Sequence, residues 1–126
     1  MRIDRLDHLV LTVADVAATV QFYVDVLGMQ EVDFGEGRKA LAFGRQKINL
    51  HHKGAEIEPK AVAATPGSAD LCLIATTALV EVIHELRTKN IAIELGPVER
   101  TGATGKIRSV YLRDPDRNLI EISNYE

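Results

Sequence analysis

The sequence predicts an α+β fold made of two successive βαβββ modules whose sheets form an open cup. Three observations lead to this prediction. The chain repeats itself faintly, each half carries one amphipathic helical stretch among strand-like runs, and the polar residues of the strands fall on one face. The 126 residues suit a single domain, residues 1–126. We place the first module at about residues 1–58 and the second at about residues 67–126.

The repeat is visible in two pairs of matching positions. The segment DHLVLTV near the N-terminus aligns with ADLCLIA, so that His8 corresponds to Asp70, 62 residues later. A helical stretch follows each segment, and the two stretches end at Gly28 and Asn90, which are also 62 residues apart. Gly and Asn most readily adopt the left-handed conformation that ends a helix. The shared offset therefore predicts two copies of one structural unit.

The offset grows towards the end of each half. Asn49 corresponds to Glu121, 72 residues later. We expect the additional residues in a mobile loop at 96–106, which is rich in Gly, Thr and Pro. A segment at 53–68 joins the halves, and its prolines argue against a long element there.

The elements of the first half follow from hydrophobic alternation and helical periodicity. Asp15 is a plausible N-cap for a helix over residues 16–27. One apolar stripe on that helix is expected to face the sheet, and it contains Val16, Val20, Tyr23, Val24 and Leu27. Strands are expected at residues 5–13, 31–34, 39–43 and 47–52.

The second half is expected to repeat this order. Its helix is predicted over residues 78–89, with Leu79, Val82, Ile83 and Leu86 facing inward. The segment RDPDRN predicts a tight turn, in which Pro115 presets a dihedral angle and Asp114 bonds the backbone. Strands are expected at residues 69–75, 92–95, 107–112 and 118–123.

Alternation along the strands sorts the side chains into two faces. Leu9, Leu11 and Val13 form a uniformly apolar face that should pack on the first helix. The opposite face collects the polar residues of both halves. If the sheets curve into a cup, its interior contains His8, Asn49, His51, Asp70 and Glu121.

Composition excludes several classes of function. The net charge of −3 gives no electrostatic basis for binding nucleic acid or an anionic membrane. No apolar run is long enough to span a bilayer, and the charged start of the chain does not resemble a signal peptide. Cys72 is the only cysteine, which excludes an intrachain disulfide. We therefore expect a cytoplasmic protein.

Two segments carry a resemblance to a known family. DHLVLTVADVAATVQFYVDVLGM and VYLRDPDRNLIEIS resemble the vicinal-oxygen-chelate superfamily, which includes glyoxalase I, extradiol dioxygenases, the fosfomycin-resistance enzymes and the bleomycin-binding proteins. The likeness covers nearly the whole chain and looks closest to glyoxalase domain-containing protein 5. It implies the glyoxalase/bleomycin-resistance/dioxygenase fold, which hosts many reactions. It also implies a homodimer, with the cup formed within one chain or between two.

The resemblance implies one divalent metal ion, Fe, Mn, Ni, Zn or Co, at four positions in the strands. These positions hold His8, Asn49, Asp70 and Glu121. His8 and Glu121 match the usual ligand types, Asp70 replaces a His or Gln, and Asn49 is expected to contact substrate. His51 lies on the same face, so a set of His8, His51 and Glu121 is an alternative to one with Asp70.

Two further residues follow from the same likeness. Tyr111, ten residues before Glu121, stands where the fosfomycin enzymes place a substrate-contacting tyrosine, and Ser109 is expected on the same wall. A metal there would act as a Lewis acid on a ligand with two adjacent oxygens. Glu121 or Asp70 is the candidate base, and Glu121 is our candidate catalytic residue.

Structural explanations exist for each of these residues. His8 could be a hydrogen-bonded core histidine, and Glu121 could pair with Arg113 or Arg117. Asp70 could cap a local turn. Cys72 is expected to face the cup as a small apolar residue. The basic residues that could attract an anionic substrate, or simply lie on a solvated loop, are Arg100, Lys106 and Arg108.

Three functions are compatible with the sequence. The first is a metal-dependent enzyme, with a lyase like glyoxalase I (lactoylglutathione lyase) favoured over an oxidoreductase like the extradiol dioxygenases. The second is a binding protein without catalysis, like the bleomycin-resistance proteins. The third is a structural or regulatory dimer with a degenerate site, for which Asn49 and Asp70 are the main support.

Overall fold

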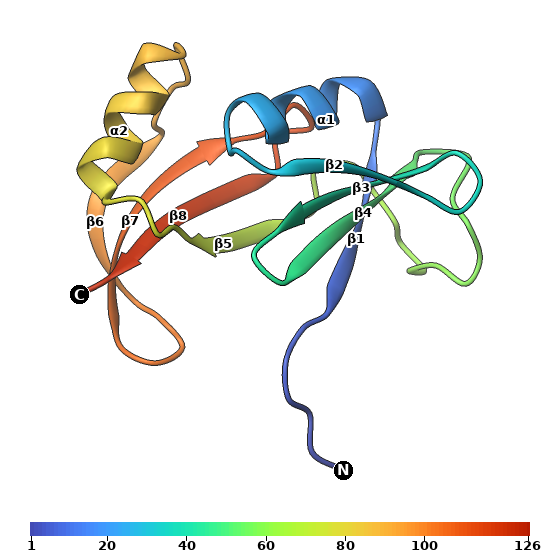
Figure 1. Ribbon diagram of the computed structural model, residues 1–126, viewed down its shortest axis with the longest axis horizontal. Helices are drawn as coiled ribbons and strands as arrows, with labels where there is room; N and C mark the ends of the chain where they lie inside the picture. The colour runs from blue at the N-terminus through green and yellow to red at the C-terminus, as the bar shows by residue number, and fades with distance from the viewer. The chain divides into compact units, whose positions relative to one another are not determined.

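A computed structural model describes residues 1–126, and the chain divides into two compact units, Met1–Gly67 and Ser68–Glu126. Each unit contains one helix and one four-stranded sheet (Figure 1). The α+β class and the βαβββ order predicted from the repeat are thus confirmed in both halves.

The first unit has the strand order β1-β4-β3-β2. The parallel pair is β1 with β4, and the other neighbouring strands are antiparallel. A parallel pair needs a long connection, which here contains α1 and the β2–β3 hairpin. The elements are β1 (His8–Val13), α1 (Val16–Asp25), β2 (Gln30–Phe34), β3 (Arg38–Phe43) and β4 (Gln46–His52).

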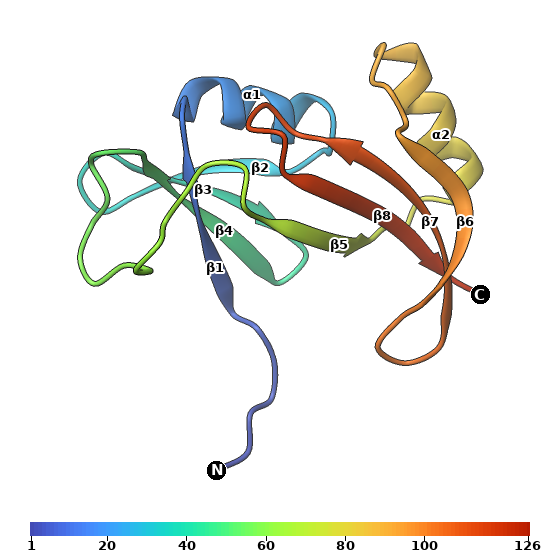
Figure 2. The same cartoon turned by 180° about the vertical axis from the view of Figure 1, so that it is seen from behind.

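The second unit repeats this topology with the order β5-β8-β7-β6. Here β5 is parallel to β8, and the β7 strand is antiparallel to both β6 and β8 (Figure 2). The elements are β5 (Asp70–Ile74), α2 (Leu79–Thr88), β6 (Leu95–Thr101), β7 (Lys106–Arg113) and β8 (Leu119–Tyr125).

The predicted cap at Asp15 and the two left-handed residues are confirmed, but the helices are shorter than predicted, since α1 ends at Asp25 instead of residue 27 and α2 spans Leu79–Thr88 instead of residues 78–89. The Asp15 carboxylate accepts a hydrogen bond from the Ala18 backbone N–H at 3.0 Å, which satisfies one free donor of the first turn of α1. Gly28 has φ +70° and Asn90 has φ +58°. Both therefore adopt the left-handed conformation after their helices, at equivalent places in the two halves.

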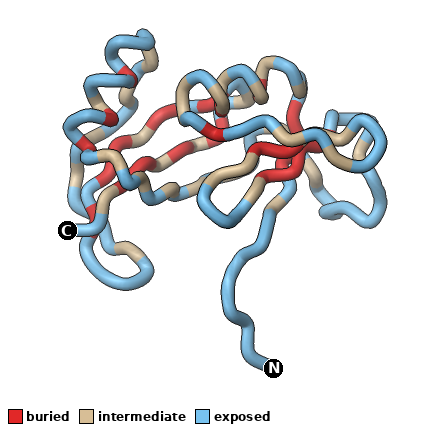
Figure 3. The backbone as a smooth tube through the Cα atoms, viewed as in Figure 1, coloured by how far each residue is buried: buried red, intermediate tan, exposed pale blue.

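The core of each unit lies between its helix and its sheet. In the first unit the fully buried side chains include Tyr23 of α1 with Leu41 and Ile48 of the sheet, and in the second Leu86 of α2 with Leu112 and Ile120. In Figure 3 the buried segments follow the strands of both sheets. The predicted stripe of α1 is only partly in this core, because Val16, Val20 and Val24 are half-buried whereas Thr19 is buried.

The prediction for residues 92–106 was wrong. The strand there is Leu95–Thr101, not residues 92–95, so most of the expected mobile loop belongs to β6. Gly96 takes φ +115°, and the register shifts between Leu95 and Val98. A glycine at such a bulge and a proline on an edge strand are compatible with a strand, although both usually indicate a loop. β6 is the edge strand of its sheet.

The first strand is shorter than expected, since β1 begins at His8 rather than at residue 5. Met1, Ile3 and Leu6 are largely exposed. Two side chains of the sheet contact residues 1–7: the Gln46 amide donates to the Leu6 carbonyl at 3.1 Å, and His8 Nδ1 lies 2.9 Å from the Asp7 carboxylate.

The turn before β8 forms as predicted. The buried Asp114 carboxylate accepts the backbone N–H groups of Asp116 and Asn118 at 3.0 and 2.8 Å. The Asn118 side chain donates to the other oxygen of Asp114 at 2.8 Å. Arg117 has φ +67°, so a residue with a Cβ occupies a left-handed position within the turn.

Candidate functional site

The registers of the two sheets confirm the predicted sorting of side chains within each unit. In the first unit Asn49 pairs with Val10 and His51 with Thr12, and His8 lies two residues before Val10 on the same strand. In the second unit Cys72 pairs with Glu121. Because the period of a strand is two residues, these side chains share the face opposite the helix of their own unit.

Asn49 is a buried polar residue with an unsatisfied atom. Its side chain is on the face away from α1, the residue is 5% exposed, and its Oδ1 has no hydrogen-bond partner. A buried carbonyl oxygen without a partner is costly, so such groups in native proteins commonly serve a ligand or an ion. His51, two residues further on, is also buried.

His8 is held by its neighbour in the sequence. Its Nδ1 lies 2.9 Å from the Asp7 carboxylate, which lowers the pKa of Asp7 through this hydrogen bond. When Nδ1 donates to a carboxylate, the lone pair of the ring is on Nε2. This arrangement commonly orients a metal-binding histidine, although both side chains here are exposed.

Two buried serines contact the Glu121 carboxylate through their hydroxyls. The hydroxyl of Ser109 donates to Glu121 Oε2 at 2.6 Å, and that of Ser123 lies 3.3 Å from the same oxygen. The two hydroxyls are 2.7 Å apart, and both residues are fully buried. Neither serine contacts Oε1, so both hydroxyls hold the carboxylate through the same oxygen.

Tyr111 pairs with Glu121 across β7 and β8. Burial raises the pKa of the Tyr111 hydroxyl, and a hydrogen bond from Arg100 opposes the increase, while Glu121 adds to it. The Arg100 Nε donates to the Tyr111 hydroxyl at 3.0 Å. Guanidinium, phenol and carboxylate therefore follow one another along the face away from α2.

Cys72 and Glu121 line a pocket of about 380 Å³ within the second unit. The Cys72 Sγ is 3.4 Å from the Ser123 hydroxyl, and burial raises the pKa of the thiol. A cavity of this size suits a small metabolite. The other residues that line it are Ile74, Arg100, Thr101, Gly102, Ala103, Ile107 and Tyr125.

The structural explanations for two acidic residues are wrong. The Arg113 guanidinium makes an ion pair with Glu94, with two contacts of 3.0 Å, and not with Glu121. Asp70 is exposed, and its carboxylate accepts no hydrogen bond, so it caps no turn. Neither Asp70 nor Glu121 therefore forms an ion pair with a basic side chain.

The sheet registers favour Asp70 over His51 as a candidate metal ligand. Asp70 is two residues before Cys72, which pairs with Glu121, so the Asp70 and Glu121 Cα atoms lie about 8 Å apart on one face. His8 pairs with Lys47, four residues before His51, which puts His8 and His51 about 14 Å apart. One ion can bridge the first spacing but not the second.

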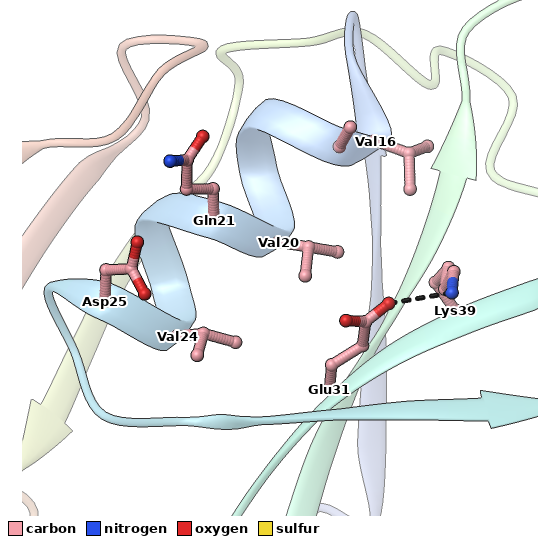
Figure 4. Close-up of a pocket in the computed structure, with 8 residues that line it drawn as sticks. Val16, Val20, Gln21, Val24, Asp25, Glu31 and Lys39 are labelled. Carbon is pink, nitrogen blue, oxygen red and sulfur yellow. Dashed lines mark ion pairs between the residues drawn. The ribbon is translucent and has the colours of Figure 1, made fainter.

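A second pocket, of about 620 Å³, lies beside α1 (Figure 4). Val16, Val20 and Val24 line its helical wall, and Glu31 and Lys39 line the strand wall. Lys39 Nζ is 2.7 Å from Glu31, and its ion pairs with Asp33 and Glu31 raise its pKa. Because the Glu31 carboxylate of this pocket is already paired with Lys39, whereas Glu121 has no basic partner, the pocket with Glu121 is the better candidate for a reactive site.

No group of three or more His, Cys, Asp or Glu side chains is close enough in the structure to hold a metal ion. Neither helix is long and apolar enough to cross a membrane. The predicted metal ligands are divided between the units, with His8 and His51 in the first and Asp70 and Glu121 in the second.

The role of Ser123 in holding Glu121 was not predicted. Its signal was its spacing of two residues from Glu121, which is typical of neighbours on one face. The sequence likewise gives no reason to separate Arg100 from the other two basic residues of this region, Lys106 and Arg108.

The fold and the site define a class, that of small proteins with paired βαβββ modules and a polar pocket on the open face of a sheet. Within that class the chain belongs to the Glyoxalase/Bleomycin resistance protein/Dioxygenase superfamily, whose family profile matches residues 5–122.

Two relatives are similar over nearly all of the chain. The Virulence protein STM3117 of Salmonella typhimurium is 60% identical over 99% of this chain and 87% of its own length. Its crystal structure has a TM-score of 0.99 and is covered in full, as is this chain. The Glyoxalase domain-containing protein RDO1 of Mycosarcoma maydis is 54% identical over 96% of this chain and 68% of its own length.

More distant structures share the fold alone. The lactoylglutathione lyase of Agrobacterium tumefaciens is 22% identical, with a TM-score of 0.74 over 98% of this chain and 95% of its own. The antibiotic-binding protein TnmS3 of a Streptomyces species is 20% identical, with a TM-score of 0.79 over 100% and 99%.

Proposed function

We propose that the protein is a divalent-metal-dependent enzyme that acts on a small oxygenated metabolite, and that its reaction resembles that of a lactoylglutathione lyase. The observation that carries this proposal is the state of Glu121. Its carboxylate lines a pocket, is fixed by two buried serines and has no basic partner. A carboxylate in this position is suited to binding a cation or accepting a proton.

We infer that the metal is held by His8, Asp70 and Glu121. The carboxylates share one face at a spacing that a single ion can bridge, and the Asp7 contact leaves His8 Nε2 able to coordinate. The unsatisfied Oδ1 of Asn49 fits a further contact with metal or substrate. A bound divalent ion would supply Lewis-acid polarisation of the substrate oxygens. Imidazole nitrogen and carboxylate oxygen together suit the borderline metals Fe, Mn, Ni, Zn and Co.

The roles of the other residues follow from their contacts. Ser109 and Ser123 position Glu121 Oε2, and Tyr111 stands beside that carboxylate, where its phenol can donate a hydrogen bond to substrate. Glu121 Oε1 would accept a proton from a substrate carbon only when it is displaced from the metal. The superfamily contains binding proteins as well, so a protein that holds a ligand without changing it is the alternative.

Metal analysis distinguishes the two functions. We expect the protein purified without chelator to carry close to one divalent ion per chain. His8→Ala and Glu121→Ala should lose it, and Asp70→Ala should bind it more weakly. His84, exposed on α2, provides the control, and both His84→Ala and His51→Ala should keep the metal. A wild-type protein that takes up no metal under any loading condition would favour the binding protein.

We also propose a homodimer, in which the cup forms either within one chain or between two. Mixing His8→Ala with Glu121→Ala protein decides between these. In a cup between two chains, each mixed dimer regains one intact site, so that about a quarter of all sites recover metal after random exchange. In a cup within one chain, every site keeps a defect and no metal returns. A protein that runs as a monomer at all concentrations would contradict the dimer itself.

A further inference from the structure

The three basic residues near the β6–β7 hairpin have different surroundings. The Lys106 ammonium is 3.8 Å from the Glu99 carboxylate. Arg108 is exposed, and its pairing with Asn124 puts it on the helix side of the sheet. Arg100 alone lines the pocket that contains Glu121. The sequence cannot distinguish these three, whereas the structure does.

The guanidinium of Arg100 is oriented but not neutralised. Its Nε donates to the Tyr111 hydroxyl at 3.0 Å, and its Nη1 donates to the Glu99 carbonyl at 3.1 Å. Its central carbon lies 5.6 Å from the centroid of the Tyr111 ring. Arg100 is exposed, and no carboxylate forms an ion pair with it. The Tyr111 hydroxyl and the Glu99 carbonyl thus orient the guanidinium without neutralising its charge.

We propose that this pocket binds a small organic ligand with a terminal carboxylate, and that Arg100 is the residue that recognises it. Guanidinium groups bind carboxylates through strong, directional hydrogen bonds. The pocket supplies one positive and one negative side chain, and a single guanidinium matches the charge of a monoanionic group. A phosphate dianion would call for more donors than Arg100 and the Thr101 hydroxyl provide.

The two charged residues give the ligand a direction. Its carboxylate would lie at Arg100, and the part that reacts would lie at Glu121, on the other side of the Tyr111 phenol. This inference extends the proposed function, because it names the substrate class for the same pocket. It depends on no bound metal, so the two can be tested separately.

Cys72 provides a reporter for the pocket. It is the only cysteine of the chain and lines the same cavity, so the rate of its alkylation by iodoacetamide measures whether the cavity is filled. We would use metal-free, full-length protein with succinate, glutarate and adipate as probes. Their diamides have nearly the same shape without the charge, and inorganic phosphate is a further arm.

We expect at least one of the three diacids to slow alkylation, and its diamide to have no effect. Arg100→Gln should weaken that protection by about tenfold to a hundredfold. Tyr111→Phe, which removes one acceptor that orients the guanidinium, should weaken it less. Arg108→Gln is the matched control, because it deletes an equal charge on the other side of the sheet. The diacid should protect Cys72 in this variant as well as in the wild type.

Several results would overturn the inference. These are equal protection by acid and diamide, unchanged protection in Arg100→Gln, stronger protection by phosphate than by any diacid, or no protection by any diacid on the order of 10 mM. If a diacid protects Cys72 through Arg100 but the protein never binds metal, this inference is supported and the proposed metal-dependent enzyme is contradicted. If the protein binds metal but no diacid protects Cys72, the metal site is supported and this inference is contradicted.

Discussion

Ser109 donates its hydroxyl hydrogen to Glu121 Oε2 across 2.6 Å, from a position with no exposed surface. A charge-assisted bond of this length restricts the carboxylate to one orientation. Ser123 bonds the same oxygen more loosely, at 3.3 Å, and contacts Ser109 as well. Strand alternation puts all three residues on one face, and the buried hydroxyls then decide where the carboxylate points.

The first prediction concerns that bond. Ser109→Ala should lower the affinity of the protein for the proposed divalent metal by about tenfold to a hundredfold, because residues that orient a metal ligand typically matter to this extent. Ser123→Ala, which removes the longer contact, should lower it less. Competition with a fluorescent chelator measures both affinities. Equal affinities in Ser109→Ala and the wild type would contradict the role that we assign to the serine.

The second prediction concerns the unsatisfied oxygen of Asn49. Asn49→Leu should raise the free energy of unfolding of the metal-free protein by about 1–2 kcal/mol, because it removes a buried polar atom without a partner. The same change should weaken metal or substrate binding. Urea unfolding measures the first effect. Asn118→Leu is the matched control, since Asn118 is buried with its hydrogen bonds made, and it should destabilise the protein.

The third prediction concerns pH. The Arg113 guanidinium lowers the pKa of Glu94 in the folded protein. A carboxylate with a depressed folded pKa stabilises the fold above its unfolded pKa, here about 4.5, and this stabilisation is lost as the pH falls through the folded value. Glu94→Gln should therefore unfold more easily than the wild type in urea at neutral pH.

As the pH falls below the unfolded pKa of about 4.5 and through the lower folded value, the difference between Glu94→Gln and the wild type should shrink towards zero. The pair is partly exposed, so raising the ionic strength should also reduce the difference at neutral pH. A difference that stays constant from neutral to acidic pH would mean that the ion pair is not its source.

The fourth prediction concerns the left-handed residue in the turn before β8. Arg117→Gly should stabilise the protein by about 0.5–1 kcal/mol, because the strain of a Cβ at φ +67° outweighs the chain entropy that glycine adds. Arg108→Gly, in the middle of β7, should instead destabilise it. Urea midpoints of the two variants, taken together, check the prediction, and a shared direction would contradict it.

Local rules predicted most of the fold. The cap at Asp15 and the left-handed residues at Gly28 and Asn90 depend on neighbours within a few positions, which a sequence displays directly. The faces of His8 and Glu121 follow from a period of two within single strands. Each of these inferences needed only the residues next to the feature.

Features set by the partner strand were harder to predict. Gly96 and Pro97 indicate a loop in isolation, but β7 pairs with this edge and converts it into β6. The spacings that separate Asp70 from His51 depend on how β5 pairs with β8 and β1 with β4. Register is a property of two segments far apart in the chain, so inspecting either one alone could not reveal it.

The duplicated frame has an electrostatic consequence. Positions 8 and 49 in one half and 70 and 121 in the other occupy equivalent places in two sheets of the same topology. One half offers an imidazole and an amide there, whereas the other offers two carboxylates. The two equivalent faces therefore differ in charge although their topology is the same. In the proposed metal site, the C-terminal half would supply the negative charge and the N-terminal half the neutral side chains.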